Sequence, residues 1–207
     1  MAASLPYPTL CLVTDMDKVG KDGLLKIIDE SVQGGVNLVQ VREKQLTKSA
    51  LESLVLDVVD IINGRALLAV NSNLEASQLP GVDFLHLPES ESGFSSSFAD
   101  PFGQSVHSVA AAKLAQQNGA KYVVVGSVFT TQSHPDMDPV GPSILMECNV
   151  SLVIPFVGIG GINVSNAAET VKLGAHGVAV ISAILAADKP KLAAAQLMDI
   201  MLDETGQ

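Results

Sequence analysis

Three polar residues, Gln40, Arg42 and Lys44, occupy every second position in the stretch VQVREK. Successive side chains of a β-strand point to opposite faces, so all three would project to the same side. Two cations on the inner side of a fold need an anion, because burying an unpaired charge is very costly. The spacing therefore predicts an anion-binding strand.

A second candidate anion site comes from the stretches FVGIGG and GVAVIS. Glycines such as Gly160 and Gly161 let the backbone approach a ligand closely, and backbone amides at a helix start favour negative charge. Glycine pairs also serve tight turns, so this signal is weak alone. Together with Ile181 and Ser182, which precede a helix-like run, it predicts a phosphate-binding site.

The stretch GQSVHS places His107 at the end of an apolar alternation and directly before a helix-like run. Histidine titrates near neutral pH, which suits it to moving a proton on a bound substrate. A lone histidine is as often a packing or capping residue, so this role requires His107 to share a site with the anion-binding residues. We interpret His86, inside a strand, and His176, on a turn, as structural.

Eight short runs rich in Val, Leu and Ile are typical of parallel strands buried on both faces. They span residues 9–15, 37–43, 66–71, 84–88, 104–108, 122–127, 156–161 and 177–182. Helix-like segments between them span residues 23–35, 49–62, 109–120, 164–175 and 183–204, whereas 74–81 and 89–103 give weak helix signals.

This alternation predicts one domain over residues 1–207, a single (β/α)8 TIM barrel of the α/β class, with an open doubly wound sheet as the alternative. In such a barrel the active site lies at the carboxyl ends of the strands. Further polar residues fall at these ends and are candidate substrate-binding residues: Asn71, Ser127, Thr131 and Ser133.

The composition narrows the class of protein. Hydrophobic residues make up 47% and charged residues 16% of the 207 residues, and the net charge of -10 argues against binding to nucleic acid or an anionic membrane. No apolar run reaches the roughly 20 residues of a membrane span, and no leader pattern is present. Two cysteines without CxxC spacing favour a reducing compartment, so we expect a cytoplasmic protein. A homo-oligomer is also compatible with the predicted fold, because barrels of this type often associate.

Five stretches together resemble the thiamin phosphate synthase/TenI family over nearly the whole chain: LVTD (12–15), VQVREKQLT (39–47), GQSVHS (103–108), AKYVVVGSVFTTQS (120–133) and VGIGGINVSNAAETVKLGAHGVAVISAI (157–184). The resemblance implies one of two activities. Synthases join a pyrimidine diphosphate to thiazole phosphate with loss of pyrophosphate and use Mg²⁺. TenI-type proteins share the barrel, and characterised ones act as thiazole tautomerases.

By this resemblance, Gln40, Arg42 and Lys44 match the diphosphate-binding strand of the synthases, and Gly160, Gly161, Ile181 and Ser182 match the thiazole-phosphate site. The synthases' metal-binding Asn-Asp-Arg motif reads Asn71-Ser72-Asn73 here, and the second metal carboxylate falls near Glu91. The synthase loop lysine is absent from Thr130-Thr131-Gln132-Ser133-His134. The Leu87-Pro88 pair and SVHS resemble TenI.

We therefore expect a TenI-like tautomerase in which the glycine stretch holds the phosphate, His107 is the acid/base, and Arg42 or Lys44 holds a carboxylate. It would need no metal or cofactor and would bind a small phosphorylated thiazole. The alternative is a synthase with Mg²⁺ held by Glu91 and Asp15 and with His134 partly replacing the lysine. A third hypothesis is a non-catalytic binder of thiazole or thiamin phosphate.

Overall fold

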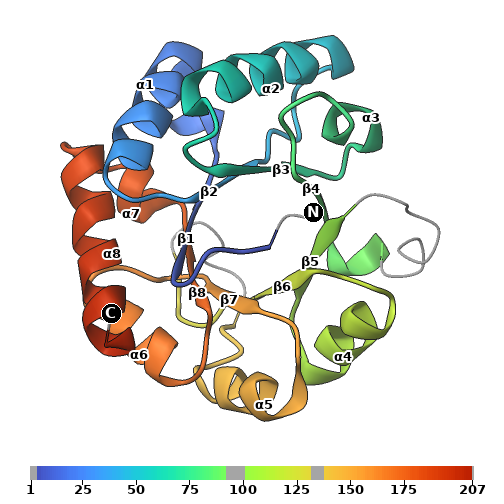
Figure 1. The fold of residues 1–207 in the computed structure, drawn as a ribbon, viewed down its shortest axis with the longest axis vertical. Coiled ribbons are helices and arrows are strands. Elements are labelled where there is room, and N and C mark those ends of the chain that lie inside the picture. The colour runs from blue at the N-terminus through green and yellow to red at the C-terminus, as the bar shows by residue number, and fades with distance from the viewer. Residues whose placement is uncertain (1–3, 92–100, 132–137, 207) are drawn as a thin grey trace.

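Eight parallel strands close into a barrel in the computed structural model, which describes residues 4–91, 101–131 and 138–206 (Figure 1). Each strand pairs with the next along the chain, and β8 pairs with β1. The strands are β1 (Thr9–Val13), β2 (Leu38–Val41), β3 (Leu67–Asn71), β4 (Phe84–Leu87), β5 (Phe102–Val106), β6 (Tyr122–Val125), β7 (Phe156–Ile159) and β8 (Gly177–Val180). The predicted (β/α)8 TIM barrel is confirmed, and the open sheet is wrong.

Helices surround the barrel on the outside (Figure 1). They are α1 (Gly20–Gln33), α2 (Lys48–Ile62), α3 (Leu74–Ser77), α4 (Val109–Gln117), α5 (Ser143–Ser151), α6 (Ala167–Lys172), α7 (Ser182–Leu185) and α8 (Pro190–Thr205), with the 3-10 helices η1 (Met16–Lys18) and η2 (Glu89–Glu91). The two weak connections hold only short helices, α3 and η2, within the described residues.

The predicted elements differ from the structure in three ways. Six predicted strands run one or two residues past their observed ends, because the chain leaves the sheet there to form loops. The third predicted strand ends where β3 ends, and β5 lies two residues earlier than predicted. The segment 183–204 forms two helices, since Pro190 is tolerated only in the first turn of α8. Helix α5 was not among the helix-like segments, because its apolar residues do not gather on one face.

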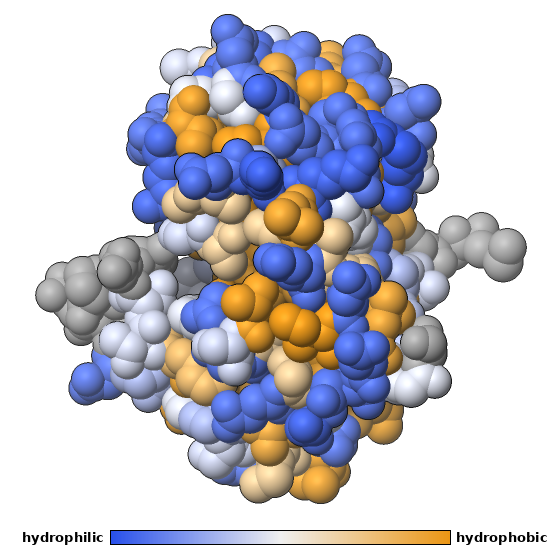
Figure 2. Space-filling model, turned by 90° about the vertical axis from the view of Figure 1, so that its left-hand side faces the viewer, coloured by the Kyte–Doolittle hydropathy of each residue, from blue (hydrophilic) through white to orange (hydrophobic). Residues whose placement is uncertain are grey.

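The core forms two layers. Apolar residues from the outer faces of the strands pack against the helices, and a smaller set fills the barrel interior, including Leu38, Phe84, Tyr122 and Val124. The outer surface over α1 and α8 is largely hydrophilic, with apolar side chains between the polar ones (Figure 2). None of the helices in the described ranges is long and apolar enough to cross a membrane.

Candidate active site

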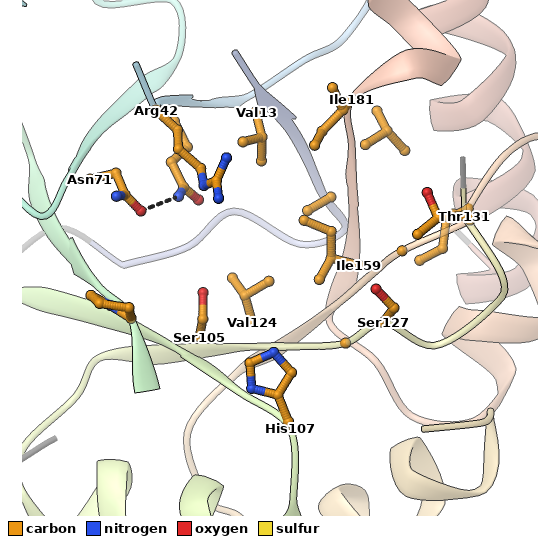
Figure 3. A pocket seen from close by; sticks show the side chains of 18 of the residues that line it. Val13, Arg42, Asn71, Ser105, His107, Val124, Ser127, Thr131, Ile159 and Ile181 are labelled. Atoms are coloured by element: carbon orange, nitrogen blue, oxygen red, sulfur yellow. Dashed lines mark hydrogen bonds between the residues drawn. The ribbon is translucent and has the colours of Figure 1, made fainter. Parts of the chain in front are cut away.

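A pocket of about 340 Å³ lies at the carboxyl ends of the barrel strands (Figure 3). It brings together eleven of the fifteen residues singled out above as candidates for catalysis, substrate, phosphate or metal binding: Gln40, Arg42, Lys44, Asn71, His107, Ser127, Thr131, Gly160, Gly161, Ile181 and Ser182. Ser133 and His134 lie outside the described residues. Glu91 does not line the pocket, and Asp15 pairs with Lys18.

The strand β2 and the residues after it supply the cationic wall. Gln40 is buried and its Nε2 donates to Asn71 Oδ1 at 3.3 Å, which joins β2 to β3. The Arg42 amide donates to Thr14 Oγ1 at 2.9 Å. Glu43, between the two cations, turns away and accepts the Met16 amide at 3.0 Å. The alternation thus leaves Arg42 on the pocket side (Figure 3), and Lys44 also lines the pocket.

The ends of β7 and β8 supply the glycine-rich wall. Gly160 has a φ of 99°, which is left-handed backbone that favours glycine, and an added Cβ would lie 2.5 Å from Ser127 Cβ. The Phe129 amide donates to the Gly160 carbonyl at 3.0 Å, so the loop after β6 is held against β7. Ser182 is the first residue of α7, the helix that follows the neighbouring strand β8. Backbone therefore forms much of this wall.

His107 follows β5 and points into the pocket (Figure 3). Glu89, in η2, accepts from the His107 amide at 2.6 Å and lies 2.8 Å from His107 Nδ1. A carboxylate accepts a hydrogen bond from Nδ1–H, which leaves Nε2 as the ring nitrogen available to a ligand. Ser108 caps α4 by accepting the Ala111 amide at 3.1 Å. The cap and the carboxylate together fix the orientation of the imidazole.

Sequence reasoning missed two polar residues of the pocket wall, Ser72 and Ser105, and it placed Glu89 at the end of the fourth predicted strand without giving it a role. Ser105 stands two residues before His107, so the alternation within GQSVHS could have identified it. The sequence did not identify His107 as the partner of Glu89, because that contact depends on η2 meeting the end of β5. His86 is buried in the barrel and His176 packs on the Tyr7 ring at 4.8 Å, which places both away from the pocket wall.

The residues present do not form the two-carboxylate Mg²⁺ site that the resemblance implies. Mg²⁺ is usually bound through one or two carboxylates plus substrate phosphates. Ser72 replaces one carboxylate, Glu91 lies off the pocket, and Glu89 already accepts from His107. Within the described ranges, no group of three or more His, Cys, Asp or Glu side chains is placed to hold a metal.

The closed barrel with a pocket at the carboxyl ends of its strands defines a TIM-barrel protein, and its pocket has cationic side chains after β2 and glycine-rich backbone at the ends of β7 and β8. Residues 10–184 match the model of the thiamine monophosphate synthase family (TMP-TENI). The chain belongs to this family.

Two relatives are named thiamine-phosphate synthase. The protein from Roseiflexus castenholzii is 32% identical over 95% of this chain and 91% of its own length, and that from Clostridium acetobutylicum is 33% identical over 93% and 94%. The solved thiamine phosphate pyrophosphorylase from Pyrococcus furiosus superposes with a TM-score of 0.84 at 27% identity, over 95% of this chain and 96% of that one. These names favour the synthase alternative over the tautomerase that we expected.

Proposed function

We propose that this protein is an enzyme of thiamine biosynthesis that acts as a thiamine phosphate synthase. The observation that carries the proposal is the pair of separate anion-binding walls in one pocket, the cations after β2 and the backbone at the ends of β7 and β8. Joining a pyrimidine diphosphate to a thiazole phosphate requires two anionic substrates side by side, and the named relatives support that reaction.

Each wall has a distinct role in this proposal. Arg42 and Lys44 hold the diphosphate and stabilise the charge that develops as pyrophosphate leaves, because preorganised cations act most strongly in a pocket shielded from water. The backbone at Gly160, Gly161 and Ser182 holds the thiazole phosphate. The two substrates then face each other across the barrel mouth, which replaces a bimolecular encounter with a positioned one.

The test is thiamine phosphate formation by the purified protein from the aminopyrimidine diphosphate and thiazole phosphate, followed by mass spectrometry with Mg²⁺ and with a chelator. We expect Arg42→Gln to lower turnover on the order of 100-fold. The matched control is Arg65→Gln, since the chain has only these two arginines and Arg65 pairs with Asp29 on the surface. No product above the no-enzyme control would refute the synthase.

A second candidate function, thiazole phosphate tautomerisation, is favoured by the contact between His107 and Glu89 and by Ser72 at the metal position. An imidazole held at Nδ1 and presenting Nε2 to a ligand can move a proton without any metal. The test supplies the non-aromatic thiazole phosphate alone and follows aromatisation by absorbance. Conversion that is lost in His107→Ala, from protein that makes no thiamine phosphate, would support this function instead.

A further inference from the structure

Three hydrogen-bonded side chains, Tyr122, His86 and Ser105, connect the barrel interior to the pocket. His86 on β4 lies fully inside, with its Nδ1 3.1 Å from the Tyr122 hydroxyl and its Nε2 2.9 Å from Ser105 Oγ. Ser105 is the one of the three that lines the pocket. His86 and Tyr122 lie deeper in the barrel and do not line the pocket.

Gly103 leaves the space that the Tyr122 ring occupies. A Cβ added there would lie 2.1 Å from Tyr122 Cζ, so the ring crosses the space that any other side chain would take. Phe84 packs against the same ring edge-on, with the centroids 5.3 Å apart and the planes at 79°. Tyr122 is therefore fixed on two sides, and its hydroxyl is directed at His86.

The donors and acceptors among the three side chains can be assigned. Burial, together with the charge of Arg42, lowers the pKa of His86 to about 3, so the imidazole is neutral and has one donor and one acceptor nitrogen. A buried hydroxyl that donates to nothing is costly, and His86 Nδ1 is the partner of the Tyr122 hydroxyl among the described residues. Tyr122 thus donates to Nδ1, and Nε2–H donates to Ser105 Oγ.

We propose that His86, held by Tyr122, is a positioning residue that turns the hydroxyl hydrogen of Ser105 into the pocket. Ser105 Oγ accepts a hydrogen bond from His86 Nε2–H, so its own O–H is left to donate to an acceptor atom of the bound ligand. This inference deepens the proposed function, on which its kinetic test rests, because Ser105 lines the same pocket.

The test compares two amides at position 86. His86→Gln places an amide near the position of Nε2 and retains a donor to Ser105, whereas His86→Asn reaches only the position of Nδ1. We expect His86→Asn and Ser105→Ala each to lower kcat/KM for thiamine phosphate formation on the order of tenfold. His86→Gln should stay within about threefold of the wild type. Melting temperatures of all variants show which of them remain folded.

A double-variant cycle separates positioning from a merely structural role. In the Ser105→Ala background, His86→Asn should cause no further loss of kcat/KM. The Ser105 hydroxyl that His86 orients is already absent there. Two losses that multiply in protein that stays folded would overturn the proposal. If His86→Asn does not fold, Tyr122→Phe replaces it in the cycle, since it removes the hydroxyl and keeps the ring beside Gly103.

A second measurement does not depend on turnover. Proton-coupled nitrogen NMR of the labelled protein, with the His86 signals assigned by their loss in His86→Gln, reports which ring nitrogen carries the proton. We expect a neutral ring with the proton on Nε2 from pH 5 to pH 8. A proton on Nδ1 would overturn the inference. A wild type that makes no thiamine phosphate refutes the proposed function, and the NMR result then decides this inference alone.

Discussion

Acidification should destabilise this protein through His86, and His86→Gln should remove that component. Burial and the nearby charge of Arg42 lower the pKa of His86 from 6.5 to about 3 in the folded protein. Between these values the unfolded chain binds a proton that the folded protein does not. The stability contributed by the neutral imidazole is therefore fully present above pH 6.5 and is lost progressively as the pH falls toward 3.

The size of the effect follows from the same two pKa values. Each pH unit within this window lowers the free energy of unfolding by about 1.4 kcal/mol. At pH 5 the loss relative to pH 7 is therefore about 2 kcal/mol; it reaches about 4 kcal/mol at pH 3 and levels off near roughly 5 kcal/mol below that pH. A typical domain has a free energy of unfolding of about 5–15 kcal/mol, so the loss at pH 5 is large enough to measure.

Urea unfolding at pH 7, 6 and 5 measures the effect in the wild type and in His86→Gln. All other titratable groups are the same in the two proteins, so their contributions cancel in the difference. Ser105→Ala is the matched control, because it removes a partner of His86 but keeps the imidazole buried, and it should retain the pH dependence of the wild type. Equal pH dependence in the wild type and His86→Gln would refute a buried neutral His86.

Three further predictions concern the pocket and its support. Gly103→Ala should lower the free energy of unfolding by about 2–3 kcal/mol, because the new Cβ overlaps the Tyr122 ring, and urea titration measures it. Glu89→Gln should lower the rate of any reaction that uses His107 on the order of tenfold or more, as measured by steady-state kinetics. Ser72→Asp should tighten Mg²⁺ binding measured by calorimetry, since Asp tolerates the φ of 53° at this position, whereas Ser72→Asn should not.

The barrel could be predicted because parallel strands buried on both faces leave apolar runs in the sequence. The ends of these runs were placed less well, because residues such as Ser182 at the pocket continue the strand pattern after pairing has stopped. Helix α5 was missed for a different reason. Its buried Leu145 and Cys148 are interleaved with exposed Met146 and Val150, so it lacks the apolar stripe of an amphipathic helix.

The site could be predicted where its geometry is local. The alternation of Gln40, Arg42 and Lys44 predicted a common direction, and all three line the pocket. The contact between Glu89 and His107 joins residues 18 positions apart across the β4–β5 connection, and no periodicity in the sequence specifies it. The metal position shows the limit of resemblance: Ser72 lines the pocket, but it brings no carboxylate there.

The stretch GQSVHS shows how six residues can encode three tertiary contacts. Its inward positions alternate, and each meets a different partner: Gly103 meets the Tyr122 ring, Ser105 meets His86, and His107 meets Glu89. The first two contacts are linked, because Tyr122 also binds His86. A side chain at position 103 is therefore expected to disturb Ser105 through the ring and the imidazole, while leaving the contact of His107 with Glu89 intact.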